Sequence, residues 1–180
     1  MANECSWTFT LYKANDEAKA RFAEMMERVN DDNMLVSIFE EEIWQSMDIP
    51  KWNTLDEVED NRILGRSAWS EPDELFAAIT EELAQVDPTV CALSTFDDEG
   101  LDFIGAAAYF AGEEVGRNVY DHDEIMEHVM KCLAEDGHED PDEDLIDDYK
   151  WEYAWDLVDT PDLKLYLDEL IVTNEKKKSA

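Results

Sequence analysis

Residues 138–149 read HEDPDEDLIDDY and combine seven carboxylates with no basic side chain. The three aspartates that begin at Asp140 have the D-x-D-x-D spacing that opens a calcium-binding loop. Such a loop needs glycine at its sixth position for a sharp turn and a bidentate glutamate at its twelfth, but this chain has Leu145 and Trp151 there. The stretch therefore does not predict a specific calcium site.

A transition-metal site is the second chemistry that the side chains suggest. Glu124, His128 and Cys132 would lie one helical turn apart on one stripe of a helix, and His122 and His138 are close in the sequence. The spacing matches neither H-E-x-x-H nor a C-x-x-C pair. A border position on an apolar helical face is the simpler interpretation of the histidine and cysteine, so we expect no metal and no cofactor.

Motifs for nucleophilic or phosphate chemistry are missing from the sequence, which has no G-x-S-x-G, P-loop or dinucleotide-binding glycine pattern. Carboxylate pairs occur throughout the chain, so none of them indicates general acid–base catalysis. The sequence therefore predicts a protein without enzymatic activity.

The charge balance is the most unusual property, with 47 acidic against 14 basic residues and a net charge of −33. Solvated helix faces explain many acids singly, and a salt-adapted surface is another interpretation. Like charges on neighbouring helical turns repel each other, however, and the total charge opposes folding. Carboxylates three or four residues apart on a helix lie ~5–6 Å apart, which is comparable to the spacing of backbone phosphates. The acids therefore indicate a surface that imitates nucleic acid.

Two groups of acids are the candidates for this surface, and both are patches in which no single residue should be critical. The main acidic patch comprises Asp121, Asp123, Glu124, Glu127, Glu135, Asp136, Glu139, Asp142, Glu143, Asp144, Asp147 and Asp148. The secondary acidic patch comprises Glu40, Glu41, Glu42, Asp56, Glu57, Glu59 and Asp60.

The same charge limits the partners. Affinity for phosphates comes from lysine and arginine, which are scarce, so we expect no direct binding of nucleic acid. No apolar run approaches the ~20 residues of a membrane helix. The expected partner is a basic nucleic-acid-binding protein or nuclease complex. A twofold homodimer, which would present one longer acidic ridge, is retained as an alternative to the monomer.

Cysteine usage and the first residues bear on the compartment. Cys5, Cys91 and Cys132 are odd in number and widely spaced, and the start of the chain has neither a basic nor an apolar leader region. We therefore expect a reducing cytoplasm.

Periodicity predicts the elements that position these residues. A strand over residues 5–12 should place Trp7, Phe9 and Leu11 on one face. A helix capped by Asn15 is predicted over 14–29, followed by a short helix over 33–48 and an irregular segment or short strand over 51–59. A strand is then predicted over 62–69 and a helix capped by Ser70 over 70–86. Two strands over 89–100 and 101–115 should form a hairpin joined at Asp98, Glu99 and Gly100.

Three helices are predicted after about residue 118. They cover 121–137, which Gly137 ends, 140–158, which Asp140 and Pro141 begin, and 160–172, which Thr160 and Pro161 begin. The order predicts an α+β fold, in which a ferredoxin-like antiparallel sheet over residues 1–116 has helices on one face. Residues 117–180 form an acidic helical extension packed on it, either as a second unit or as part of one single domain.

Three stretches of the first part resemble the YubB-type ferredoxin-like-domain family of phages and plasmids. They are the opening MANECSWTFTL, the strand-to-helix junction SAWSEPDELF, and the hairpin FDDEGLDFIGAAAYFAGEEV. In the junction, Glu71 replaces the first proline of the family's Trp-Ser-Pro-Pro-like pattern. In the hairpin, Gly100, Phe103 and Gly105 match. The resemblance covers residues 1–116 and implies a fold and a mobile-element origin, with no catalytic residues to carry over.

The function predicted from these observations is that of a phage- or plasmid-encoded acidic DNA mimic in the host cytoplasm. It would bind and inhibit a host DNA-binding defence protein, such as a restriction or CRISPR nuclease complex, by occupying the basic cleft. The alternative is an acidic adaptor or assembly protein that binds its partner through an apolar aromatic surface without mimicking DNA. Trp151, Tyr153 and Trp155 would supply that surface.

Overall fold

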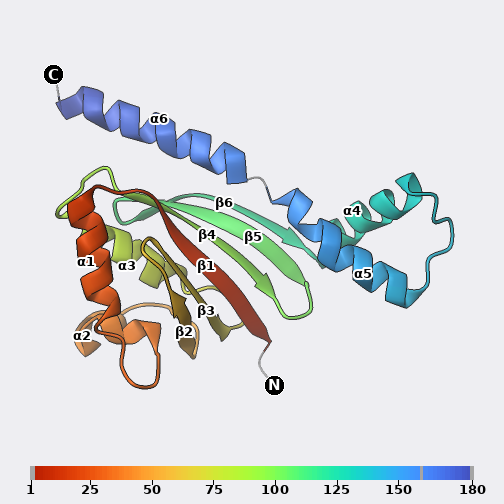
Figure 1. Cartoon of the computed structure of the whole chain (residues 1–180), viewed down its shortest axis with the longest axis horizontal. Coiled ribbons are helices and arrows are strands. Elements are labelled where there is room, and N and C mark those ends of the chain that lie inside the picture. Colours follow the sequence, from red (N-terminus) through yellow and green to blue (C-terminus); the bar gives the residue numbers. More distant parts are fainter. Residues whose placement is uncertain (1–2, 159, 179–180) are drawn as a thin grey trace.

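The computed structural model describes residues 3–158 and 160–178. Within them, six strands form one antiparallel sheet in the order β2-β3-β1-β4-β5-β6 (Figure 1). The strands are β1 (Glu4–Lys13), β2 (Asn53–Val58), β3 (Arg62–Ala68), β4 (Cys91–Asp98), β5 (Phe103–Phe110) and β6 (Glu113–Asp121).

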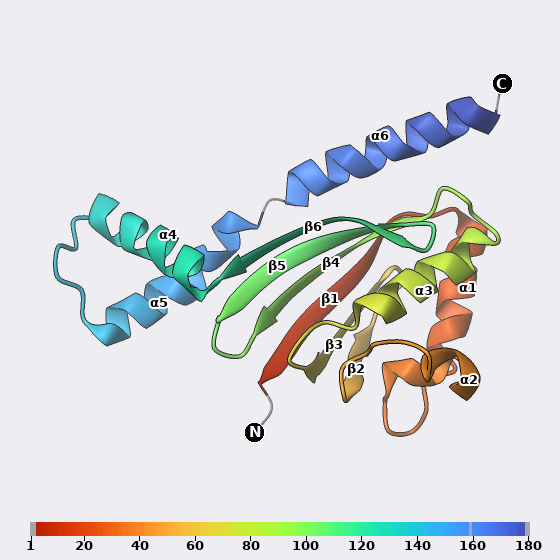
Figure 2. The ribbon, with the colours of Figure 1, turned by 180° about the vertical axis from the view of Figure 1, so that it is seen from behind.

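The helices lie on both faces of this sheet. One face carries α1, α3 and the short segments that precede β2, and the other carries the C-terminal helices, as the view from behind in Figure 2 also shows. The helices are α1 (Asp16–Met26), α2 (Glu41–Trp44), α3 (Asp73–Ala84), α4 (His122–Glu135), α5 (Glu143–Tyr153) and α6 (Thr160–Lys178), and the 3₁₀ segments are η1 (Leu35–Ile38) and η2 (Ala154–Leu157).

The first four strands have the ferredoxin-like arrangement. The chain runs β1-α1-β2-β3-α3-β4, and these strands take the spatial order β2-β3-β1-β4 with antiparallel neighbours. The strands β5 and β6 then extend the sheet on the β4 side. The α+β fold class predicted from the sequence is confirmed. Gly116, at the proposed border between the two parts of the chain, lies within β6.

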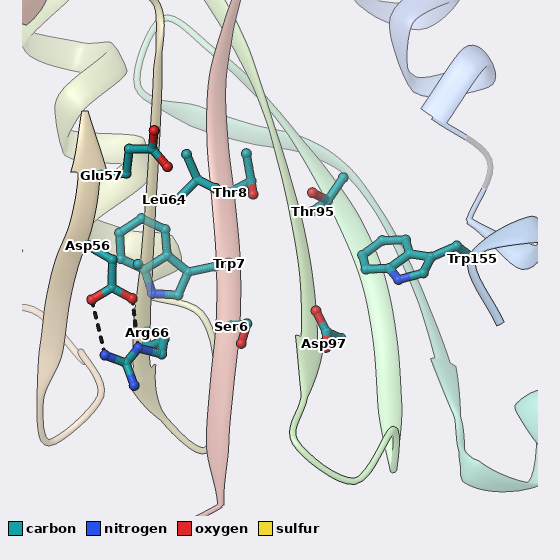
Figure 3. Close-up of a pocket in the computed structure, with 11 residues that line it drawn as sticks. Ser6, Trp7, Thr8, Asp56, Glu57, Leu64, Arg66, Thr95, Asp97 and Trp155 are labelled. Carbon is teal, nitrogen blue, oxygen red and sulfur yellow. Dashed lines mark hydrogen bonds and ion pairs between the residues drawn. The ribbon is translucent and has the colours of Figure 1, made fainter. Parts of the chain in front are cut away.

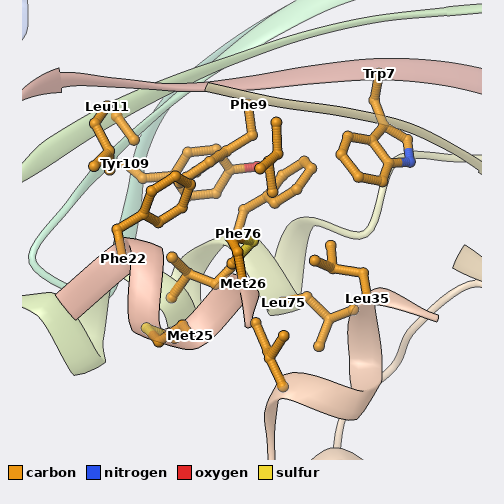
Figure 4. Packing of buried hydrophobic residues seen from close by; sticks show 14 of the residues in the cluster. Trp7, Phe9, Leu11, Phe22, Met25, Met26, Leu35, Leu75, Phe76 and Tyr109 are labelled. Atoms are coloured by element: carbon orange, nitrogen blue, oxygen red, sulfur yellow. The ribbon is translucent and has the colours of Figure 1, made fainter. Parts of the chain in front are cut away.

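The core on the first face is aromatic. Trp7, Phe9 and Leu11 all point to this face from β1, as their alternation predicts, and all three are buried. The Phe9 ring stacks on Phe76 of α3 with 4.7 Å between the ring centroids, and Phe22 of α1 packs on its other side (Figure 4). Burial of these rings against α1 and α3 stabilises the packing of the helices on the first four strands.

A second core lies on the other face of β4 and β5. The residues of these strands alternate between the two cores, so Ala107 belongs to the first core, whereas Ala106 and Ala108 belong to the second. Such small side chains allow helices to approach the strand closely. The members that the C-terminal helices contribute to the second core include Ile125, Val129 and Leu133 of α4 and Leu163, Leu167 and Ile171 of α6.

Three details differ from the expectation. The strand β6 was not predicted, because its residues are mostly polar or half-exposed and pairing with β5 stabilises it instead. Ser70 does not cap α3, whose N-cap is Pro72 without a side-chain hydrogen bond, and the Ser70 carbonyl accepts from the Ser67 hydroxyl. Asp140 does not cap α5, because Asp142 accepts from the backbone N–H of Leu145 and the helix begins after it.

A buried ion pair joins α3 to β6. Glu71 is 3 % exposed and accepts a hydrogen bond from Arg117. Arg117 also binds Glu114 at 2.6 Å and lies over the Phe96 ring at 5.4 Å. Burial raises the pKa of the Glu71 carboxyl, and the positive charge of Arg117 opposes that rise.

We expect Arg117→Ala to destabilise the protein by about 3 kcal/mol, because it leaves the buried Glu71 carboxylate without a partner. The free energy of unfolding in urea near neutral pH measures this effect. Arg62→Ala is the matched control: it removes an exposed pair with Glu59 and should change the stability by less than about 1 kcal/mol. Equal losses in the two variants would show that the Glu71 pair has no special role.

Candidate functional site

The acidic lobe, defined as residues 121–153, is the most highly charged part of the molecule. It contains fourteen acidic residues and two lysines. Its helices α4 and α5 form an antiparallel pair that extends beyond one end of the sheet (Figure 1). All twelve members of the main acidic patch belong to the lobe, and all twelve are exposed.

Both ends of α4 are fixed by hydrogen bonds. At the start, the Asp121 carboxylate accepts from the backbone N–H of Glu124 at 3.0 Å, and the Glu124 carboxylate accepts from that of Asp121 at 3.0 Å. This is a capping box. At the end, Gly137 has a φ of +86°, its N–H donates to the carbonyl of Ala134, and the next N–H donates to that of Leu133. This Schellman motif confirms that Gly137 ends the helix.

The second helix is tied to the first. Tyr149 of α5 donates a hydrogen bond from its hydroxyl to the Asp136 carboxylate at 2.8 Å, and this bond raises the pKa of Tyr149 to about 12. The Tyr149 ring packs against the rings of His138 and Tyr153. Leu145 also packs, partly buried, against the second core, so the stretch that looked like a calcium loop is a helix start.

The lobe is docked on the tip of the β4–β5 hairpin. Leu101 is fully buried in the second core with α4, and its φ of +51° places this leucine in the left-handed region of backbone conformation. Asp98 holds the turn by accepting from the backbone N–H of Asp102 at 2.5 Å. Lys150 of α5 is 8 % exposed and donates to the Gly100 carbonyl at 2.6 Å. One of the two lysines of the lobe therefore anchors it.

The carboxylates of the main acidic patch divide into two sets. Asp121, Glu124, Asp136 and Asp142 accept the hydrogen bonds described above, and Glu135 lies 4.0 Å from Lys131. Among the residues that the structure describes, the other seven accept no hydrogen bond and form no ion pair, so they are free for a partner. They are Asp123, Glu127, Glu139, Glu143, Asp144, Asp147 and Asp148.

The secondary acidic patch is not brought together with the main one. Its members lie on α2, on β2 and in the β2–β3 turn, on the side of the molecule away from the acidic lobe (Figures 1 and 2). All seven are exposed. Asp56 binds Arg66 at 2.7 Å and Glu59 binds Arg62 at 2.6 Å, so part of this charge is neutralised within the scaffold.

The residues considered for a transition metal are also separated by their roles. His128 and Cys132 are neighbours on α4, with 3.7 Å between Nε2 and Sγ, but the carboxylate of Glu124 belongs to the capping box. Over the described ranges, no group of three or more His, Cys, Asp or Glu side chains is arranged to hold a metal ion.

A groove on the open part of the sheet was not expected from the sequence. The C-terminal helices cover β5, β6 and the first part of β4, and Asp168 of α6 binds Tyr12 and Lys13 at the end of β1. They leave the same face of β2, β3 and the rest of β1 open. The sheet groove, about 300 Å³ in volume, lies at this border (Figure 3). It is lined by Ser6, Trp7, Thr8, Asp56, Glu57, Leu64, Gly65, Arg66, Thr95, Asp97 and Trp155.

Asp97 is the acid of this groove whose pKa departs from its ordinary value. It is half-buried, and no described residue gives it a hydrogen bond or an ion pair. Burial, and then the neighbouring charge of Asp98, raise the pKa of Asp97 to about 6. The alternation of Ser6 and Thr8 with the buried aromatics of β1 was the available signal for a polar face, but it did not reveal that one acid on β4 would be desolvated.

Comparison with known proteins finds no family model, no curated protein and no solved structure that matches this chain. Within residues 3–158 and 160–178, no helix combines the length and the apolar character needed to span a bilayer. The likeness to the YubB-type family stays a prediction, and the functional argument depends on the side chains described above.

We expect Asp97→Asn to stabilise the protein at about pH 7.5. Because the folded-state pKa lies above the ~3.9 of an unfolded aspartate, the folded state holds the proton more tightly, and that stabilisation is lost as the pH rises through about 6. The gain of the variant over the natural protein should therefore shrink towards about pH 4. Urea unfolding across this range tests it.

Asp148→Asn is the control, since this carboxylate is exposed on the acidic lobe. The difference in the free energy of unfolding between this variant and the natural protein should change little over the same pH range. A pH-independent difference for Asp97→Asn would contradict a desolvated carboxylate in the sheet groove.

Proposed function

We propose that this chain is a non-enzymatic DNA mimic that binds and inhibits a host DNA-binding defence protein, such as a restriction or CRISPR nuclease complex, by occupying its basic DNA cleft. The observation that carries the proposal is the acidic lobe, in which two capped helices and the segments next to them carry fourteen acids and two lysines. The proposed phage or plasmid origin, and action in the host cytoplasm, rest on the resemblance of residues 1–116 to the YubB-type family.

The arrangement of the carboxylates suits a cleft built for phosphates. Neighbouring turns of a helix place side chains ~5–6 Å apart, so the free acids of α4 and α5 form rows with a spacing comparable to that of a nucleic-acid backbone. A field of this sign also steers a basic partner and makes association fast and sensitive to salt. The seven free carboxylates are the groups that such a partner would pair.

Rigidity supports mimicry over a merely solubilising surface. The capping box, the Schellman motif, the Tyr149–Asp136 hydrogen bond and the Lys150 anchor hold the acids on a defined frame. A surface that only needs charge for solubility gains nothing from such fixation. A ligand that is already ordered loses less conformational entropy on binding, which favours affinity.

A second candidate function is an acidic adaptor that binds through aromatic surface. Trp151 is 54 % exposed and Trp155 is 39 % exposed, whereas Tyr153 is partly buried against Tyr149. Exposed tryptophans are enriched at the centres of protein interfaces. In this alternative the charge would serve solubility and the indoles would provide the contact.

Neutralising three free acids together, with Asp144, Asp147 and Asp148 changed to Asn, should weaken inhibition. Each exposed charge pair contributes up to about 1 kcal/mol, so the triple variant should bind its target roughly 10- to 100-fold more weakly. The measurement is displacement of duplex DNA from a candidate nuclease complex, at about 50 mM and about 300 mM salt.

The matched control carries Glu27→Gln, Asp31→Asn and Asp32→Asn, which remove the same charge from exposed positions outside both patches. It should retain most of the inhibition. Equal weakening by the two triple variants would indicate a general effect of net charge, and failure of the natural protein to displace DNA at low salt would refute mimicry.

Trp151→Ala separates the two candidate functions. The adaptor predicts that this variant loses its partner, while the triple charge variant keeps it. The DNA mimic predicts the opposite result, in which the triple charge variant loses binding and Trp151→Ala keeps it. The reason is that the indole carries no charge for a basic partner to pair. Binding of both variants to the same isolated target, measured by calorimetry, shows which order holds.

A further inference from the structure

We propose that the sheet groove binds an arginine side chain of the basic partner, with the guanidinium stacked on Trp155 and paired with Asp97. The inference rests on the proposed function for the identity of the partner, but the recognition of a guanidinium is a property of the groove itself. Figure 3 shows the indole across the groove from Asp56 and Glu57, beyond Thr95 and Asp97.

The floor of the groove offers hydrogen-bond acceptors that the protein does not use. The hydroxyls of Ser6, Thr8 and Thr95 line it, and none of them makes a hydrogen bond to another described residue. Asp97 adds a carboxylate that is likewise without a partner. A guanidinium has five N–H donors and no acceptor, so it can satisfy a carboxylate and several hydroxyls at once.

Charge excludes an anionic occupant. Arg66 is the cation of the groove, but Asp56 binds it through two hydrogen bonds of 2.7 and 3.2 Å and Glu4 binds it at 3.2 Å. Its charge is therefore balanced before any ligand arrives. The remaining acids, Glu57 and Asp97, leave the groove negative, and a phosphate or a carboxylate would be repelled.

The aromatic wall selects arginine over other cations. The Trp155 ring is 39 % exposed and projects from η2, which follows directly on the acidic lobe. A planar guanidinium stacks on an indole face and still presents its donors at the ring edge, whereas a lysine ammonium is a strongly hydrated point charge. Because the groove adjoins the lobe, one partner can pair with the free acids and place an arginine here.

The test is a titration of the full chain with Nα-acetyl-arginine amide, followed by the NMR shift of the Trp155 indole N–H. We expect saturable binding with a dissociation constant on the order of millimolar. Nα-acetyl-lysine amide should bind more weakly, and the uncharged analogue Nα-acetyl-citrulline amide should not bind. Equal binding of the citrulline analogue would overturn the proposal.

Two groove variants and one control complete the experiment. Asp97→Asn and Trp155→Ala should each weaken arginine binding at least about tenfold, whereas Asp31→Asn, at an exposed position outside both acidic patches, should leave it unchanged. Binding to Trp155→Ala is followed by the backbone amide shift of Thr95. Binding should also weaken below about pH 6 as Asp97 takes up a proton, with Asp98 as the neighbouring acid that raises its pKa. Equal weakening by Asp31→Asn would mean that arginine binds only through general charge.

The same variants in the DNA-displacement assay separate this proposal from the proposed function. Weaker inhibition by Asp97→Asn, with the lobe intact, supports an arginine of the partner in the groove. Unchanged inhibition by a variant that has lost arginine binding overturns that assignment while DNA mimicry stands. Arginine binding by a natural protein that displaces no DNA refutes mimicry and leaves guanidinium recognition standing.

Discussion

The C-terminal half of the molecule depends on one constraint, the burial of β5 on both faces. A strand that is covered by helices on both sides must carry small or apolar side chains in both alternating positions. The alanines of β5 meet this requirement, since Ala107 faces the aromatic core and its two neighbours face α4 and α6. Larger side chains here would hold the helices away from the sheet and leave the acidic lobe without a support.

The basic residues are distributed unevenly between the sheet with its helices and the acidic lobe. Arg117 holds α3 to β6, Arg66 joins β2, β3 and β1 through two carboxylates, and Arg21 ties α1 to Glu82 of α3. These three arginines thus compensate acids of the scaffold, and Arg117 pairs with the buried Glu71, where desolvated charge is most costly. The acidic lobe receives two lysines, and one of them docks it. The uncompensated charge is therefore confined to surface that is free to meet a partner.

Much of the fold followed from local patterns, and the predictions failed where an element depends on other parts of the chain. Alternation placed Trp7, Phe9 and Leu11 in the core, and Asn15 caps α1 by accepting from Ala18. The strand β6 was missed because an edge strand gains its stability from its neighbour, and a polar sequence carries no record of that pairing. Asp140 and Asp142 are equivalent as cap residues in the sequence, and only the path of the connecting loop decides between them.

The candidate site also has one part that local sequence patterns predict and one part that they do not. The main acidic patch could be predicted because helical caps and charge are both local properties, whereas its separation from the secondary acidic patch depends on the order of strands in the sheet. The sheet groove depends on which part of one face the C-terminal helices leave open, so Asp97 could not be distinguished from the other acids in advance.

The secondary acidic patch has a consequence for self-association. The strand β2 lies at the edge of the sheet, where one row of backbone N–H and C=O groups is open to pairing with another molecule, as in amyloid growth or domain swapping. Its end carries Asp56, Glu57 and the exposed Val58, and its ladder with β3 is interrupted by a register shift. Two such edges brought together would place like charges within one ladder. The acids at this edge therefore oppose strand-to-strand pairing of two copies of the chain.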